Sequence, residues 1–467
     1  MRIAVPFRAL LILVLLSGCG AAGTRLSPVH PAQTTTTATY WRTYHLNAAR
    51  TGDDSKEPSF AHLVPKWTAP AVDGAVYGEP LVNGSNIIIA TETDSLYAFV
   101  AGTGQQHWHV SLGTPRTSNF PCGDIMPLGI TGTPVIAGGY LFAVAEVEQP
   151  PGTYRFHLAK VNPSSGTVVY NKDITPAGMN TNTEQQRAAL AVSNGNVVIA
   201  WGGLDGDCGT YHGYVETVSE TDGSEVAQWN DTAHDNEGGI WAASGPAVDS
   251  GGNIYVTTGN GSTTDVTMYD YSDSVVKLSP TLSPLSFFAP GPPQAWTSLN
   301  STDSDLSSIG PSLLKNGLLF AIGKGGRGYL LNQSSLPSNS NPGGGENFSA
   351  QVCKRTGDAA FSGMALAGSR LYIPCEDGIA AVNIDSATAF HLVWYSTSGS
   401  SAPIVAGGLI WALKVFGGSV VYGLDPATGA VSAQLSLPAT TEHFATPVSG
   451  DGELFVAAGN LLCAFAP

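Results

Sequence analysis

Charged residues are scarce in this sequence, where they make up 12% of the 467 residues. The basic ones are fewer than the acidic ones, with 20 Lys and Arg against 36 Asp and Glu and a formal net charge of −16. They form no cluster, and because nucleic-acid binding depends on clustered Lys and Arg, a nucleic-acid partner is excluded. Glycine (56), proline (30) and hydrophobic residues (43%) are abundant instead. This turn-dense composition leaves little material for long helices and predicts an all-β fold.

The one marked apolar run is N-terminal, in "MRIAVPFRALLILVLLSGCG", and is too short for an ordinary membrane span. Its basic start at Arg2 and Arg8, its apolar middle and its small residues before Cys19 are typical of an export signal, which we assign to residues 1–18. The "LSGC" ending resembles the lipobox of bacterial lipoproteins, in which the cysteine receives lipid and becomes the mature N-terminus. The alternative is a chance cysteine after a plain secretory signal.

Residues 19–39 lack apolar periodicity and are rich in Thr, Pro and Ala, so we interpret them as a flexible tether. The folded body is therefore expected to begin near Tyr40 and to extend over residues 40–467.

Cysteine is also rare, and five residues remain after Cys19. In an oxidising compartment they can pair, but the odd number leaves at least one free thiol. Cys463 lies in the apolar stretch "NLLCAFAP" and is expected to be buried and free. For the other four, we expect disulfides that join Cys353 to Cys375 and Cys122 to Cys208.

The sequence repeats itself. The stretch "DSLYAFVAGTGQQHWHVSLG" (94–113) has counterparts in "HLAKVNPSSGTVVYNKDI", "YVETVSETDGSEVAQWN", "GIAAVNIDSATAFHLVWYS" and "VVYGLDPATGAVSAQLSL", each of which predicts a strand, a tight turn and a strand. A second phrase precedes each copy and carries a proline before its own strand in six of eight instances. These prolines are Pro80, Pro134, Pro246, Pro311, Pro403 and Pro447. Eight units of four short strands predict an eight-bladed β-propeller, since a sandwich would not repeat its sequence.

The two ends of the chain complement each other. The eighth copy stops at "LLCAFAP" without its last strand, while an orphan "HLVPKWTAP" precedes the first copy. An open ring would expose strand edges, so we expect Leu63 to Thr68 to complete the last blade.

The phrase "LYAFVAGTGQQHW" and its copies resemble the tryptophan-docking repeat of the PQQ-like, or quinoprotein alcohol dehydrogenase-like, propellers, over roughly residues 40–467. The tryptophans at the repeated position are Trp108, Trp229 and Trp394, and we expect these rings to pack between neighbouring blades. The family includes quinone dehydrogenases, polymer-oxidising relatives and non-catalytic lipoprotein scaffolds of outer-membrane assembly, so the fold alone does not decide the function.

The resemblance also implies a site for pyrroloquinoline quinone (PQQ) and Ca²⁺. "GGIWAASGPAVDSGGNIYVTTGN" would supply Trp241 to stack on the quinone and Asn260 as a metal ligand. "DSDLSSIGPSLLKNGLLFAIGKGG" would supply Asp305 as the base and Lys324 as the cation near the quinone oxygens. A hard cation polarises the quinone while a carboxylate takes a proton from the alcohol.

Two departures weaken this implication. No two cysteines are adjacent, whereas many family alcohol dehydrogenases place a Cys-Cys pair against the quinone. The expected glutamate ligand falls at Cys208, so Asp207 would have to turn inward to replace it. The site residues also occupy ordinary repeat positions, where turn Asn, capping Asp and solvated Lys are common.

Other polar connections have weaker signals. "HDNEGG" carries His234, Asp235 and Glu237, but its spacing fits no metal motif, and we interpret it as a polar connection between blades. A Cys122 to Cys208 bridge would pin two connections on one face, together with Asp124, Asp207 and His212.

These observations predict a monomeric, exported propeller anchored by lipid at the cell envelope, at an outer membrane or at the outer face of the cell membrane. The leading interpretation is a binding or scaffolding module with a protein partner, or a small-molecule or polymer substrate, at one propeller face. The alternative is a PQQ-dependent oxidoreductase that acts on an alcohol, a sugar or a polymer.

Overall fold

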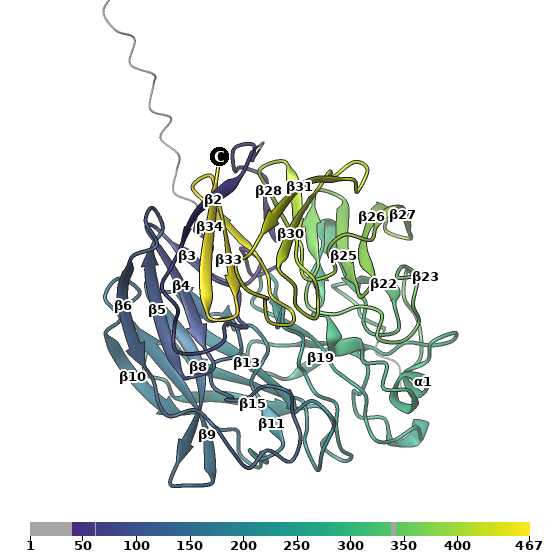
Figure 1. Ribbon diagram of the computed structural model, residues 1–467. Helices are drawn as coiled ribbons and strands as arrows, with labels where there is room; N and C mark the ends of the chain where they lie inside the picture. The colour runs from purple at the N-terminus through teal and green to yellow at the C-terminus, as the bar shows by residue number, and fades with distance from the viewer. Residues whose placement is uncertain (1–39, 61, 338–341) are drawn as a thin grey trace, which may run out of the picture. The chain divides into compact units, whose positions relative to one another are not determined.

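Eight antiparallel sheets, each with four strands in a meander, form the body of the computed structural model, which describes residues 40–60, 62–337 and 342–467 (Figure 1). The first strand of each sheet is mostly buried and the last is mostly exposed, as in β3 (Leu81–Asn83) and β6 (Gln106–Ser111). The first strands of several neighbouring sheets contact one another and form an inner ring. The predicted eight-bladed all-β propeller is confirmed.

The remaining blade strands follow in chain order. Blades 1 to 4 contain β3 with β4 (Asn86–Thr91), β5 (Ser95–Val100) and β6; β7 (Val135–Ala137), β8 (Tyr140–Gln149), β9 (Thr153–Val161) and β10 (Val168–Asp173); β12 (Ala191–Ser193), β13 (Asn196–Gly203), β14 (Tyr214–Ser219) and β15 (Glu225–Asn230); and β16 (Ala247–Val248), β17 (Ile254–Thr257), β18 (Val275–Leu278) and β19 (Pro284–Phe288). Blades 5 to 8 contain β20 (Ser312–Leu313), β21 (Leu318–Ala321), β22 (Arg327–Asn332) and β23 (Phe348–Gln351); β24 (Ala365–Ala367), β25 (Arg370–Cys375), β26 (Gly378–Ser386) and β27 (Ala389–Ser396); β28 (Ile404–Ala406), β29 (Leu409–Ala412), β30 (Val420–Leu424) and β31 (Val431–Ser436); and β32 (Val448–Gly450), β33 (Glu453–Ala458), β34 (Leu461–Ala466) and β2 (Val64–Thr68).

A few short elements lie outside this plan. They are β1 (Asp53–Asp54), which pairs in parallel with β28, β11 (Glu184–Gln185), which extends β13, the helix α1 (Trp296–Ser301), and the 3₁₀ turns η1 (Val266–Met268), η2 (Leu306–Ser308) and η3 (Lys315–Gly317). None of the helices in the described ranges has the length and apolar character needed to cross a membrane.

The repeated prolines mark the start of the inner strands. Pro80, Pro134 and Pro246 each stand directly before the first residue of an inner strand, and the other three do the same. Proline lacks an amide hydrogen and is therefore tolerated just before a strand rather than within it. In these six blades the proline therefore marks where the inner strand begins.

Aromatic rings join one blade to the next, as the repeat predicts. A side chain at Gly104 would meet the Trp67 ring at 2.5 Å, and one at Gly166 would meet the Trp108 ring at 2.8 Å. Both glycines have positive φ, so each forms the turn and leaves room for the ring. The Trp67 indole N–H also donates to the Ala101 carbonyl of blade 1 at 2.8 Å.

The last blade closes in the predicted way. β2, from the N-terminal side of blade 1, pairs antiparallel with β34, so that Val64 lies opposite Ala466 and Thr68 opposite Cys463. In Figure 1 the purple β2 lies beside the yellow β34. This pairing covers the edge of β34 and leaves β2 as the outer strand of blade 8.

Both expected disulfides are present. Cys122 is bonded to Cys208 and Cys353 to Cys375, while Cys463 is free and buried. The predicted cysteine pattern is confirmed. Cys19 and the predicted signal and tether lie outside the described residues.

An N-terminal segment, residues 41–60, lies across the inner strands and was not predicted. Backbone amides of inner strands donate to its carbonyls: Ile136 to Arg42 at 2.7 Å, Val248 to Ala48 at 2.9 Å, Leu366 to Thr51 at 2.7 Å and Val405 to Gly52 at 2.8 Å. These donors come from blades 2, 4, 6 and 7, and each is the second residue of its inner strand. The segment therefore fills the space that the inner strands surround.

Arg50 is the centre of this segment. Its side chain is buried and donates to the carbonyls of Pro246 and Leu190, each at 3.0 Å, and to the Thr43 hydroxyl at 2.7 Å. The contacts tie the segment to blades 3 and 4. Because a buried cation without such partners is costly, these bonds make Arg50 a structural anchor.

Candidate functional site

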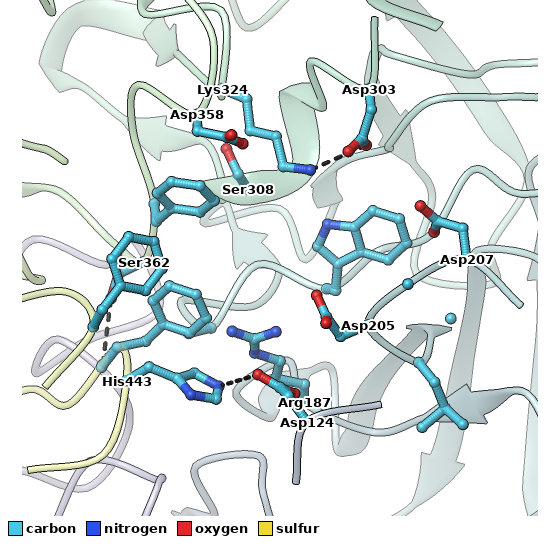
Figure 2. Close-up of a pocket in the computed structure, with 18 of the residues that line it drawn as sticks. Asp124, Arg187, Asp205, Asp207, Asp303, Ser308, Lys324, Asp358, Ser362 and His443 are labelled. Atoms are coloured by element: carbon cyan, nitrogen blue, oxygen red, sulfur yellow. Dashed lines mark hydrogen bonds and ion pairs between the residues drawn. The ribbon is translucent and has the colours of Figure 1, made fainter. Parts of the chain in front are cut away.

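A pocket of about 490 Å³, which we call the funnel, opens among two kinds of connection: those that lead into the inner strands and those that join the second and third strands of a blade (Figure 2). Carboxylates, cations and aromatic rings dominate its lining. These are the acids Asp124, Asp205, Asp207, Asp303, Asp358 and Glu376, the cations Arg187, Lys324 and Arg355, and the rings Trp241, Phe361, Phe416 and Phe444. Six carboxylates thus face three permanent cations, so the lining favours a ligand that is not strongly anionic, or an anion that binds together with a cation.

Trp241 is built as an open platform. A side chain at Gly239 would meet its ring at 2.0 Å and one at Gly202 at 2.6 Å, so only glycines leave space behind the indole. The ring of Tyr211 packs at 5.9 Å between centroids. Trp241 is half-buried and lines the funnel, which leaves ring surface available for a planar ligand.

Lys324, Asp305 and Asn260 form one connected group. The Lys324 ammonium lies 2.5 Å from Asp305 Oδ2. The other oxygen, Asp305 Oδ1, accepts a hydrogen bond from the backbone N–H of Asn260 at 2.9 Å. The sequence prediction therefore brought together residues that contact one another. Lys324 lines the funnel, whereas Asp305 is fully buried and does not belong to the lining.

Asp303 is the carboxylate of this group that faces the funnel. It lies 3.1 Å from the Lys324 ammonium, and its side chain is 58% exposed. Figure 2 shows the two side chains pointing toward each other at the edge of the pocket. Sequence reasoning did not single out Asp303.

Charge and burial act in opposite directions on this group. Burial raises the pKa of Asp305 above its ordinary value, and the neighbouring Lys324 opposes that rise. The two carboxylates hold the pKa of Lys324 above its ordinary value despite the burial of the ammonium. Lys324 is therefore a permanent cation at neutral pH and favours the ionised form of Asp305.

The predicted metal ligands are near one another without forming a complete set. The Asn260 side-chain amide donates to Glu237 Oε2 at 3.1 Å, and its side-chain carbonyl oxygen is buried without a hydrogen-bond partner among the residues that the structure describes. Asp207 lines the funnel and accepts the Tyr211 hydroxyl at 2.6 Å. Across the described part of the chain, no three His, Cys, Asp or Glu side chains converge as ligands of a metal ion. Oxygen donors are present, but the carboxylates are not arranged around a common point.

Glu237 lies against one of the predicted site residues. The "HDNEGG" segment does connect two blades, yet it also brings Glu237 against Asn260. Burial, followed by nearby carboxylates led by Asp207, raises the pKa of Glu237 to about 7.

The Cys122 to Cys208 disulfide pins two funnel connections. It ties the Asp205–Asp207 turn to the connection that carries Asp124. Asp124 in turn lies 3.7 Å from His443 Nε2 (Figure 2). Of the three side chains expected on this face, Asp124 and Asp207 line the funnel, whereas His212 lies 3.0 Å from the Thr232 hydroxyl and does not belong to the lining.

Arg187 and the three phenylalanines were also missed by sequence reasoning. A positional signal was available, because Arg187, Ser308, Phe361 and Phe444 each stand four residues before the first residue of an inner strand. That place in the repeat turns toward the funnel. Unlike the tryptophans that pack between blades, the residue at this position varies among Arg, Ser and Phe, so a search for a recurring residue does not reveal it. Phe416 lies in another kind of connection, between β29 and β30.

Comparisons with known proteins agree with the fold. A family model described as outer membrane protein assembly factor BamB matches residues 64–206. No curated protein matches the chain in sequence. A quinohemoprotein alcohol dehydrogenase from Comamonas testosteroni superposes with a TM-score of 0.69 at 13% identity, covering 91% of this chain and 80% of that one. BamB from Moraxella catarrhalis superposes with a TM-score of 0.56 at 12% identity, covering 87% and 98%.

A europium-containing methanol dehydrogenase superposes with a TM-score of 0.65 at 14% identity, covering 92% of this chain and 98% of that chain. The eight blades, the tryptophan-docking repeat and these likenesses agree with one another. The described part of the chain is therefore an eight-bladed β-propeller with the fold of the quinoprotein alcohol dehydrogenases.

Proposed function

We propose that the funnel binds a planar quinone of the PQQ type and that the protein oxidises an alcohol. The observation that carries this proposal is the open Trp241 platform in the same pocket as Lys324, which is joined to Asp305 and Asn260. Two structural relatives, a quinohemoprotein alcohol dehydrogenase and a methanol dehydrogenase, support the same reaction class.

The residues present fit the quinone. A volume of about 490 Å³ accommodates a small tricyclic molecule, and Trp241 offers a stacking surface. Lys324 would donate hydrogen bonds to quinone oxygens. When bound, such a quinone supplies the two-electron acceptor for oxidation of an alcohol to a carbonyl compound.

The residues fit calcium less well, because the available oxygen donors do not converge. We assign no step to the ion. The excess of carboxylates nevertheless supports a cation that enters together with an anionic quinone, and the test below measures this directly.

Two carboxylates compete for the role of proton acceptor. Asp305 is the residue that the family resemblance favours, and Lys324 keeps it ionised, but it lies behind the lysine. Asp303 shares the same lysine and is exposed to the funnel. We propose that the alcohol proton goes to one of these two carboxylates while Lys324 holds the ligand oxygens.

Calorimetry of the purified protein with PQQ, in Ca²⁺ and in EGTA, tests cofactor binding. We expect micromolar or tighter binding that is stronger in Ca²⁺, lost in Trp241→Ala and retained in the control Trp229→Phe, whose ring packs against Tyr271 outside the funnel. Dye reduction with an alcohol panel then compares Asp303→Asn with Asp305→Asn. Absence of binding in both buffers at tens of micromolar PQQ would refute the proposal.

A second candidate is a lipid-anchored binding or scaffolding module of the cell envelope. The match of residues 64–206 to the BamB model favours it. We propose that Cys19 carries the lipid, and mass spectrometry of the mature N-terminus tests this, with Cys19→Ser as control. Co-purification of an envelope protein with a chain that binds no PQQ would favour the scaffold over the enzyme.

A further inference from the structure

Three phenylalanines from three connections meet on one wall of the funnel, which we call the phenylalanine wall. Phe361 precedes β24, Phe416 lies between β29 and β30, and Phe444 precedes β32. The Phe361 ring is 5.6 Å from the Phe416 ring and 5.8 Å from the Phe444 ring, measured between centroids. All three line the pocket. Connections from blades 6, 7 and 8 thus contribute the same side chain to one place.

The wall does not belong to the hydrophobic core. Phe416 is 60% exposed, and none of the three rings occurs in the buried clusters between blades. An exposed aromatic group inside a pocket keeps apolar surface in contact with water, and a ligand that covers it gains free energy.

The backbone that presents the wall is locally strained. Phe444 has a φ of 61°, and Ser362, which follows Phe361, has a φ of 84°. Both are held by hydrogen bonds, from the Phe444 amide to the Val415 carbonyl at 2.7 Å and from the Ser362 amide to the Ser308 carbonyl at 3.0 Å. Strained non-glycine residues persist where the surroundings fix them, and they concentrate at ligand sites.

The surroundings of the wall also select the charge of its ligand. The Arg187 guanidinium lies 4.0 Å from the centre of the Phe444 ring and already occupies that π surface, while Asp124 and Asp205 lie near the guanidinium. The lining as a whole has twice as many carboxylates as permanent cations. An anion therefore gains little here, and an uncharged ring is favoured.

We propose that the phenylalanine wall binds an uncharged aryl group, so that the substrate is an aryl alcohol rather than a short aliphatic alcohol or an aryl carboxylate. The statement about the alcohol rests on the proposed function, whereas recognition of the aryl group does not. The ring would pack against Phe361 and Phe416, with its alcohol carbon toward Lys324 across the funnel.

The test measures aryl binding without any quinone. ¹⁹F NMR titration of 4-fluorobenzyl alcohol and 4-fluorobenzoate is run on the wild type and on the variants Phe416→Ala and Phe416→Leu. Leu392→Ala is the control, because Leu392 is exposed on β27 outside the funnel. Since Phe416 is exposed, its variants should fold, which circular dichroism and thermal melting verify.

We expect the alcohol to bind the wild type, with affinity reduced at least fivefold by Phe416→Ala, less by Phe416→Leu and not by Leu392→Ala. The benzoate should bind at least fivefold more weakly than the alcohol, and excess cyclohexylmethanol should compete poorly. Equal affinity in the wild type and Phe416→Ala, equal affinity for alcohol and benzoate, or no aryl binding would each overturn the proposal. This titration contains no PQQ, so it is independent of the calorimetric test of PQQ binding. If the aryl alcohol binds but PQQ does not, only the enzyme proposal is refuted.

Discussion

Two sets of aromatic rings in this propeller have opposite surroundings. Trp67, Trp108 and Trp394 each cover a turn glycine of the next blade and donate the indole N–H to a carbonyl of that blade at 2.8 to 3.0 Å. In the funnel, Trp241 rests on glycines as well, but its indole N–H has no hydrogen-bond partner among the described residues, and Phe416 is largely exposed. The repeated rings have their packing and hydrogen-bond partners within the fold, whereas the funnel rings keep surface available for a ligand.

The largest expected difference concerns stability. Trp108→Ala should lower the free energy of unfolding by about 3 to 5 kcal/mol, because it removes a nearly buried ring and leaves a void over Gly166. Trp241→Ala should lower the free energy of unfolding by less than about half of that amount, since the Trp241 ring is already partly exposed. Guanidinium denaturation followed by circular dichroism measures both, and equal losses would contradict the comparison.

A smaller effect is expected from the partner of a docking ring. Gly104→Ala should destabilise the protein by about 2 kcal/mol, because alanine is strained at the positive φ and its methyl group would meet the Trp67 ring. Gly102→Ala is the matched control, since no atom outside its immediate neighbours lies within 4 Å of the added carbon. Thermal melting of both variants tests the prediction. A loss for Gly102→Ala as large as that for Gly104→Ala would show that Trp67 is irrelevant to it.

Buried carboxylates can be compared with exposed ones in the same way, and here we expect the smallest effect on stability. Glu92 is buried, accepts hydrogen bonds from the Gly129 amide and the Thr131 hydroxyl, and has a pKa raised by burial to about 8. A raised folded-state pKa gives a contribution to stability that is present below the unfolded value near 4.5 and lost as the pH rises through about 8. Glu92→Gln should remove this loss of stability.

Melting temperatures between pH 6.5 and 9 measure that difference. The wild type should lose stability with rising pH more steeply than Glu92→Gln. Glu225→Gln, at an exposed position of β15, controls for the change in net charge. Parallel profiles for the wild type and Glu92→Gln would show that Glu92 is already ionised in the folded protein at pH 6.5.

The sequence predicted what the propeller repeats. The inner strands after each proline, the closing strand β2 and the docking of Trp108 follow from recurring residues and from the need to cover strand edges. The resemblance assigned Lys324 and Asp305 to one site, and the structure brings them into contact, although the functional roles of both residues stay predictions. Strand alternation and turn residues determine these features locally, so they can be predicted from a single sequence.

What the sequence did not reveal depends on places where connections meet. Phe361, Phe416 and Phe444 are far apart in the chain and come together only because the ring brings three connections to one wall. The N-terminal segment was missed for a similar reason. Its main partners are backbone amides of inner strands, which no residue type in the sequence identifies.

That N-terminal segment has a consequence for how the protein folds. Its Asp54 carboxylate accepts a hydrogen bond from the Ser449 hydroxyl of blade 8, and β2 pairs with β34 of the same blade. The first residues of the folded body can therefore form all of these contacts only after nearly all blades have formed. Such non-local contacts slow folding and make it cooperative, so the blades are expected to become stable together rather than one after another.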